Sequence, residues 1–302
     1  MKRFTDLAST GITNSWSYIA TITLLIVGYL GCQIIGLIIL IPFIIKGALE
    51  NVSTNEAFIM LLGKNGFFVF ILFPFVVVFC LIILAVRYIH KRSIQSIFTN
   101  RAAFDWKRVF FSFCVMTLFL LVTLLIRLAS NDGLQLIFDW KKFVPIAFFV
   151  MALIPIQIAA EELLFRSYLM QGLKLRLGHN GLAALISGIM FGLIHLGNPE
   201  IAAVGFHLVF YYIMAGIFLS LVVLFDDGIE LTLGYHAANN IFAALVITSD
   251  WQAFQTDAIF LDTSIPGNGY DAIFSSLVLY VILFFIFAKK FNWSQLKEIW
   301  RS

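Results

Sequence analysis

Charged residues are scarce in this chain of 302 residues. Only 12% are Asp, Glu, Lys or Arg, whereas 61% are hydrophobic and the mean hydropathy is +0.96. A soluble globular domain carries about 25% charged and about 45–50% apolar residues. A soluble fold of this length could not bury so much apolar surface, so the composition excludes that class. The net charge of +3 is too small to indicate a nucleic-acid partner.

Cysteine is also rare, and several common motifs are missing. Cys32, Cys80 and Cys114 lie singly in apolar runs, without the spacing of a disulfide framework or a cysteine metal site. The His-Glu-x-x-His motif of zinc proteases is absent. The sequence shows no internal repeat, and this absence argues against a transporter built from repeated halves. The first apolar run is too long for a signal-peptide core, so we expect it to stay in the membrane.

Long apolar runs are abundant. Crossing the hydrocarbon core takes about 20 apolar residues, and backbone polar groups must pair with each other inside lipid, so each run predicts a helix. We predict an all-α membrane protein with about eight transmembrane helices, forming a single polytopic domain over residues 1–302, with lipid around it. The runs cover residues 18–45, 66–86, 109–126, 143–160, 180–197, 201–225, 231–247 and 272–288.

The distribution of Lys and Arg predicts the orientation. Most of the 20 basic residues fall in segments on the same side as the N-terminus, whereas the loop 248–271 contains aspartates and no basic residue. Because cytoplasmic loops are enriched in Lys and Arg, we expect both termini to be cytoplasmic. The expected location is the plasma membrane.

Three groups of polar residues interrupt the apolar runs. A charge at the bilayer centre costs at least about 2.5–3.5 kcal/mol, so such residues are candidates for function. Within each group, residues four positions apart share a helix face. The groups are Glu161, Glu162 and Arg166; Phe191 and His195; and His236 and Asn240.

The two adjacent glutamates should have different roles. They point about 100° apart on a helix. We expect Glu162 to pair with Arg166, four residues later, as a structural ion pair. Glu161 then remains free for chemistry.

The spacing around Gly178 predicts a helical hairpin. Glu161 precedes this residue by as many positions as His195 follows it, so the two should lie at one height. Phe165 and Phe191 form a second pair of this kind. Gly188 and Gly192 are spaced to let a neighbouring helix approach closely. His236 lies near the start of its run, so the polar groups should meet in the cytoplasmic half of the membrane.

Each group has a simpler interpretation when taken alone. Glu161, Glu162 and Arg166 could form an ion-paired helix end at the membrane surface. His195 and Asn240 could be residues that hold packed helices together. The occurrence of all three groups at compatible depth favours a reactive site.

These motifs resemble those of the CPBP family, which comprises CAAX proteases and bacteriocin-processing enzymes and is also called Abi. The family pattern is Glu-Glu-x-x-x-Arg, then Phe-x-x-x-His, then His-x-x-x-Asn, and the matching core covers residues 143–247. The resemblance implies an intramembrane endopeptidase that acts on a membrane-associated protein or peptide, in a cavity open to the cytosol. A non-catalytic membrane scaffold or bacteriocin-immunity protein of the same family is the alternative. The matching residues are Glu161, Glu162, Arg166, Phe191, His195, His236 and Asn240.

Peptide hydrolysis needs a base to activate water and hydrogen-bond donors for the oxyanion. The resemblance implies that Glu161 and His195 activate the water and that His236 and Asn240 stabilise the oxyanion, with Glu162, Arg166 and Phe191 in support. The set of Glu161, His195 and His236 would also suit a catalytic zinc ion with one open position. The spacing does not separate these two mechanisms, and we favour the one without a metal.

Overall fold

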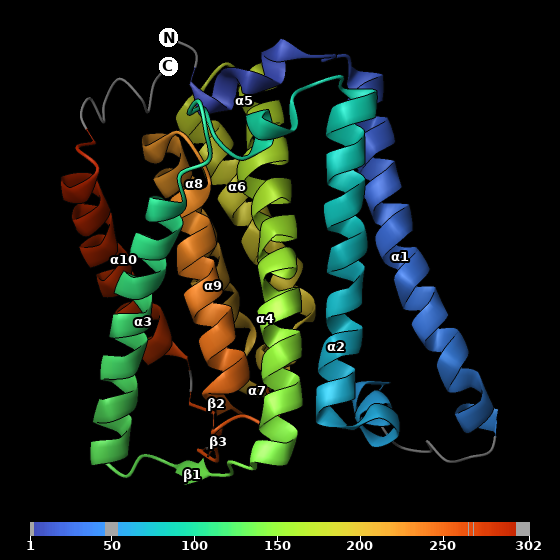
Figure 1. The fold of residues 1–302 in the computed structure, drawn as a ribbon, viewed down its shortest axis with the longest axis vertical. Helices are drawn as coiled ribbons and strands as arrows, with labels where there is room; N and C mark the ends of the chain where they lie inside the picture. The colour runs from blue at the N-terminus through green and yellow to red at the C-terminus, as the bar shows by residue number, and fades with distance from the viewer. Residues whose placement is uncertain (1–2, 46–53, 265, 268, 294–302) are drawn as a thin grey trace.

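The computed structural model describes residues 3–45, 54–264, 266–267 and 269–293. Its helices run side by side as one bundle, and a small sheet closes one end (Figure 1). The α-helices are α1 (Ser15–Ile45), α2 (Thr54–Leu84), α3 (Trp106–Ala129), α4 (Trp140–Glu162), α5 (Met170–Leu177), α6 (Asn180–Ile194), α7 (Pro199–Val204), α8 (Val209–Asp226), α9 (Glu230–Leu245) and α10 (Tyr270–Lys290).

Shorter elements join these helices. Two π-helical stretches, η2 (Ala85–Ile89) and η4 (Leu163–Leu169), continue α2 and α4. The 3-10 turns are η1 (Phe4–Thr10), η3 (Ile94–Ile97), η5 (His195–Gly197) and η6 (Phe206–Leu208). The sheet has the order β1-β3-β2, antiparallel between β1 (Leu134–Leu136) and β3 (Phe260–Asp262) and parallel between β3 and β2 (Ile247–Thr248).

The predicted class is confirmed. In the described part of the chain, seven helical spans are long and apolar enough to cross a membrane. The run 231–247 corresponds to α9, which has 16 residues and packs against α3, α4 and α8. A helix enclosed in this way needs no long apolar surface of its own. Because α4, η4 and α5 follow one another without a break, the fourth span reaches Leu177, as the hairpin requires.

One predicted helix begins later than expected, with its membrane span at Phe206–Asp226. The run 201–225 was expected to be continuous, but α7 ends at Val204 and α8 begins at Val209. Gly205 between them has a φ of +121°, a backbone conformation that glycine adopts far more readily than other residues. Because the sequence is apolar on both sides of Gly205, composition alone does not show that the helix stops there.

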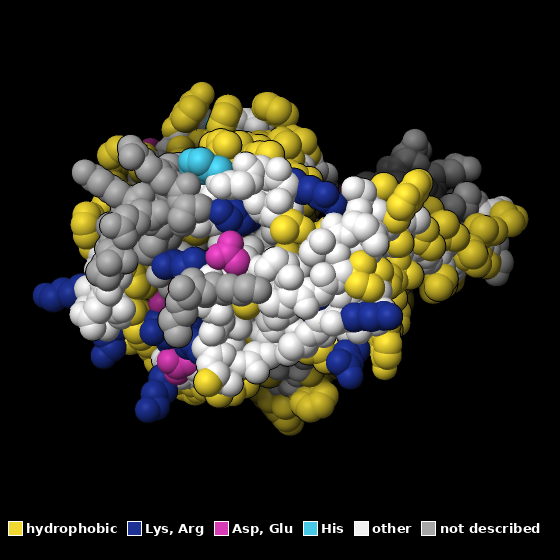
Figure 2. Space-filling model, turned by 90° about the horizontal axis from the view of Figure 1, so that it is seen from above, with side chains coloured by type: hydrophobic (Ala, Val, Ile, Leu, Met, Phe, Trp, Pro, Cys, Tyr) yellow, Lys and Arg dark blue, Asp and Glu magenta, His cyan; other side chains and the backbone are white. Residues whose placement is uncertain are grey.

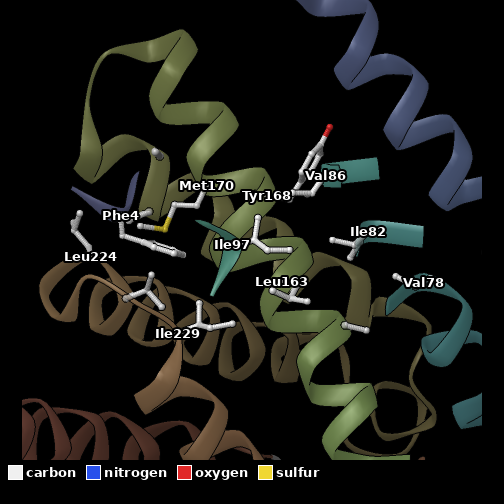
Figure 3. Packing of buried hydrophobic residues seen from close by; sticks show 14 of the residues in the cluster. Phe4, Val78, Ile82, Val86, Ile97, Leu163, Tyr168, Met170, Leu224 and Ile229 are labelled. Carbon is white, nitrogen blue, oxygen red and sulfur yellow. The ribbon is translucent and has the colours of Figure 1, made fainter. Parts of the chain in front are cut away.

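The two ends of the bundle differ in the elements that lie there. The turn η1 and the last residues of α10 lie at one end, and the sheet lies at the other (Figure 1). Figure 2 looks onto the first end, where Lys and Arg side chains are more numerous than Asp and Glu. An apolar cluster beneath this end joins η1, α2, η3, η4, α5 and α8 (Figure 3); it includes Phe4, Val78, Ile82, Val86, Ile97, Leu163, Met170 and Leu224.

An acidic turn between α8 and α9 holds this end together. Asp226 and Glu230 have side chains that are almost fully buried, and Arg101 lies 3.0 Å from a carboxylate oxygen of each. Asp227 lies 3.0 Å from the Nε of Arg3. These ion pairs fix the start of α9 against segments from distant parts of the chain.

Helices α6 and α8 touch through their backbones. A Cβ atom on Gly188 would lie 2.5 Å from the amide nitrogen of Ile217, and one on Gly192 would lie 2.5 Å from that of Ile213. Gly216 of α8 faces Gly188 directly. The close approach predicted from the spacing of Gly188 and Gly192 is confirmed.

This contact predicts that Gly188→Ala lowers the thermal stability of the protein in detergent. The added methyl group would overlap a helix backbone that cannot rotate away, and overpacking of this kind costs about 1–3 kcal/mol or more. Gly31→Ala is the matched control, because a Cβ on Gly31 meets no atom of the described residues within 4 Å. Equal melting temperatures for the two variants would contradict the backbone contact.

A second prediction concerns the sheet, which Asp262 joins to α3 through Arg127 at 2.8 Å. Burial alone would raise the pKa of Asp262, but hydrogen bonds from Arg127 and Ser264 bring that pKa below its ordinary value of 3.8. A carboxylate whose pKa is lower in the folded than in the unfolded protein stabilises the fold at pH values above its unfolded-state pKa. This stabilisation is lost as the pH falls through its folded-state pKa.

Asp262→Asn should therefore lower the melting temperature at about pH 7, and the difference from the parent protein should shrink between about pH 5 and about pH 2. Asp271→Asn changes an exposed aspartate on α10 and serves as the control. A difference that stays constant with pH would contradict a role for the Asp262 charge.

Candidate active site

The site begins where α4 changes into the π-helical stretch η4. Glu161 and Glu162 are the last residues of α4, and both are buried. Single π-helical turns are frequent at functional sites, because the wider turn redirects the side chains that follow. Here the residues redirected include Phe165 and Arg166.

Glu162 is fully buried and has two cationic or hydrogen-bonding partners. Its Oε1 atom lies 3.3 Å from Nη1 of Arg166, which confirms the predicted pair. The same oxygen lies 3.0 Å from Nδ1 of His236 on α9. Arg166 in turn places its guanidinium carbon 3.8 Å from the centre of the Phe191 ring, a cation–π distance. Glu162 therefore connects three helical segments.

His236 lies between the two glutamates. Because a carboxylate accepts hydrogen bonds, the contact with Glu162 places a hydrogen on Nδ1 of His236. Its Nε2 atom then faces Glu161, 3.6 Å from Oε2. That distance is too long for a hydrogen bond, and it leaves both atoms able to act on a third group.

Glu161 uses only one of its two oxygens within the described structure. Its Oε1 atom accepts a hydrogen bond of 2.6 Å from Nε2 of Gln157. Its Oε2 atom is buried and has no hydrogen-bond partner among the described residues. A buried carboxylate oxygen without a partner is costly and calls for an explanation. Oε2 of Glu162 is also buried without a hydrogen-bond partner among the described residues, so what distinguishes Glu161 is that its open oxygen faces Nε2 of His236.

His195 follows α6 as the first residue of η5 and is half-buried. Its Nδ1 atom lies 2.7 Å from the carbonyl oxygen of Phe191, so Nδ1 carries the hydrogen and Nε2 is the acceptor in the neutral ring. The His195 ring stacks on Tyr212 of α8, with centroids 4.3 Å apart and an angle of 17°. The sequence did not indicate Tyr212, because a tyrosine in an apolar run is usually a packing residue.

The predicted hairpin register agrees with the structure. Gly178 ends α5 with a φ of +68°, and α6 begins two residues later. The Phe165 and Phe191 rings, one of the predicted pairs, lie 5.5 Å apart. The centroid of the Phe191 ring also lies 4.7 Å from that of His195 and 6.2 Å from that of His236. Through this ring the residues of α6 join those of α4 and α9.

Asn240 joins the site through a residue that the sequence analysis missed. Its Nδ2 atom donates a hydrogen bond of 3.0 Å to Oε1 of Gln157, which also binds Glu161. Gln157 is the single amide in the apolar run 143–160, four positions before Glu161. That spacing puts it on the same helix face and could have revealed it.

Glu161, His195 and His236 are side chains that can bind zinc, but the described residues do not bring them together as a metal site. In the described parts of the chain, no group of three or more His, Cys, Asp or Glu side chains could hold one. The alternative zinc set of Glu161, His195 and His236 is therefore not assembled in this arrangement. The chemistry proposed below uses protein groups alone.

Comparison with known proteins agrees with the motifs. Residues 140–242 match the family model described as type II CAAX prenyl endopeptidase Rce1-like. The chain is also similar to "Uncharacterized protein YyaK" of Bacillus subtilis (strain 168), with 33% identity over 168 residues. That match covers 55% of this chain and 56% of the relative, so the chain spans just over half the length of the curated protein it matches. No solved structure matches.

The family match includes all three motifs, and it confirms the resemblance to CAAX proteases that they carry. Together with the seven spans that are long and apolar enough to cross a membrane, the match supports an integral membrane protein.

The geometry predicts that Glu162→Ala lowers the yield of folded protein. The substitution would leave the fully buried Arg166 without its carboxylate, and breaking a buried pair in this way costs about 3–5 kcal/mol. The double variant Glu162→Leu with Arg166→Met should restore the yield, because an apolar pair of similar volume avoids the uncompensated charge. Monodispersity in detergent and melting temperature measure both effects. A single variant as stable as the parent protein would contradict a structural role for Glu162.

Proposed function

We propose that this protein hydrolyses a peptide bond in a membrane-associated protein or peptide, using a water molecule activated by Glu161 and His195. The observation that carries this proposal is the Oε2 atom of Glu161, which is buried, faces Nε2 of His236 and has no hydrogen-bond partner among the described residues. A carboxylate oxygen in this state can accept a proton from water.

The proposed reaction assigns one role to each group. Glu161 takes a proton from the water through Oε2, while the acceptor Nε2 of His195 orients that water. The new C–O bond forms as the carbonyl becomes an oxyanion. Asn240 donates to the oxyanion from the amide hydrogen that Gln157 does not use. His236, held by Glu162, presents Nε2 beside Glu161. Once Nε2 has received from Glu161 the proton taken from water, it donates a hydrogen bond to the oxyanion.

Collapse of the tetrahedral intermediate completes hydrolysis. The C–N bond breaks, and the proton taken from water passes to the leaving amine. Glu161 delivers it directly or through Nε2 of His236, which lies 3.6 Å away. The proton left on the new carboxyl group also passes to the amine, so the products are a carboxylate and an ammonium group, and the site returns to its starting protonation.

The same evidence supports an orientation for the chain. We propose that the end with η1 and the end of α10 faces the cytoplasm of a plasma membrane, because Lys and Arg side chains prevail there (Figure 2). His236 lies in the second turn of α9, whose first residue follows the acidic turn at that end. The site would then lie in the cytoplasmic half of the membrane.

The proposal predicts that Glu161→Gln lowers the cleavage rate about 10²-fold or more, because the amide keeps the shape but cannot accept the proton. The measurement uses purified protein in lipid nanodiscs and a quenched fluorogenic peptide ending in a farnesylated CAAX sequence. The same peptide without the prenyl group tests whether the lipid is recognised. Glu56→Gln, an exposed glutamate at the start of α2, is the matched control.

A second arm searches for natural substrates. Membrane peptides that accumulate in cells carrying Glu161→Gln, and not in cells carrying Glu56→Gln, are expected cleavage targets. If the parent protein cuts neither probe and the two strains have the same peptides, the endopeptidase proposal fails. That result would favour the non-catalytic scaffold or immunity protein.

A further inference from the structure

We infer that Gln157 is a positioning residue that sets the orientation of both the catalytic carboxylate and the oxyanion donor. This inference rests on the proposed function and extends it to a residue outside the three motifs. Gln157 lies on α4, one turn before Glu161, and only 3% of its surface is exposed.

The geometry is a chain of two hydrogen bonds across a helix interface. Nε2 of Gln157 donates to Oε1 of Glu161 at 2.6 Å, within α4. Oε1 of Gln157 accepts from Nδ2 of Asn240 at 3.0 Å, from α9. One side chain therefore connects the proposed base to the proposed oxyanion donor.

The direction of this chain is set by chemistry. A carboxylate can only accept hydrogen bonds, so the amide of Gln157 must turn its NH₂ group toward Glu161. Its carbonyl oxygen then faces Asn240, which must donate a hydrogen bond to it from its own NH₂ group. Since that group carries two hydrogens, the second remains for the oxyanion.

Loss of Gln157 would remove this constraint on Asn240. Its amide could rotate by half a turn and present a carbonyl oxygen, which would repel an oxyanion instead of stabilising it. The carboxylate of Glu161 would also lose the donor that occupies Oε1. With Oε1 occupied, Oε2 is the oxygen directed at His236 and at the reacting water.

A simpler role for Gln157 is an amide that only holds α4 and α9 together. The two roles differ in what a substitution changes. An amide that only joins helices affects stability, and the protein that does fold keeps its kcat. A positioning residue affects kcat in folded protein, because small misplacement of reacting groups costs about 10²-fold in rate.

The test is Gln157→Met, which preserves length and volume but removes both hydrogen bonds. We expect kcat on the fluorogenic peptide to fall about 10- to 100-fold, with KM changed less than about twofold. Gln171→Met is the matched control, since Gln171 is an equally buried glutamine that bonds Arg92 and Ser96 outside the site. It should lower the melting temperature while folded protein keeps its kcat.

A double variant tests whether Gln157 acts through Asn240. Asn240→Ala removes the donor. The fall in kcat in the double variant should therefore be smaller than the product of the falls in the two single variants. Fully multiplicative effects would show that the two residues act independently and would overturn the inference.

The remaining outcomes separate the inference from the proposed function. If Glu161→Gln is inactive while Gln157→Met keeps the parent kcat, the inference fails and the proposed function stands. A lower melting temperature with unchanged kcat per folded molecule overturns the inference in the same way. If Glu161→Gln keeps full activity, the proposed mechanism fails, and the inference fails with it.

Discussion

The buried carboxylate of Glu162 is the constraint on which the rest of the site depends. A charge in a low-dielectric interior is tolerated only when it is paired and hydrogen-bonded. Glu162 meets this requirement with Arg166 from η4 and His236 from α9. These two residues are thereby held in place, and Arg166 also covers the ring of Phe191 on α6. One structural carboxylate thus aligns the three helices that carry the motifs.

Backbone packing and buried ion pairs give this alignment its rigidity. The glycine contact between α6 and α8 brings Tyr212 against His195, since a larger residue at Gly188 would push the helices apart. At the other side of the site, ion pairs of Asp226 and Glu230 hold the first turn of α9. Because α9 is short and enclosed, its position depends on these contacts more than on lipid.

Helices and same-face pairs could be predicted from the sequence because both depend on residues near each other in the chain. Apolar runs gave the spans, and the four-residue spacing gave the Glu162–Arg166 pair. The break at Gly205 was missed because apolar composition continues through it. The four-residue spacing could have revealed that Gln157 shares a helix face with Glu161. It could not reveal the contact of Gln157 with Asn240, nor that of Tyr212 with His195. Periodicity shows which face a residue occupies, whereas only the tertiary fold shows which residue of another helix lies opposite.

The contrast between the surroundings of the two glutamates is the basis of the different roles that we propose for them. Glu162 contacts a guanidinium and an imidazole, which hold its carboxylate in a fixed place. Glu161 is held by one neutral amide, and its second oxygen stays open toward His236. Adjacent carboxylates in unlike surroundings commonly divide into a fixed group and a reactive one. The helical turn between them creates that difference. It brings Glu162 within 3.3 Å of Arg166 and 3.0 Å of His236, whereas Glu161 is hydrogen-bonded to Gln157 and lies 3.6 Å from His236.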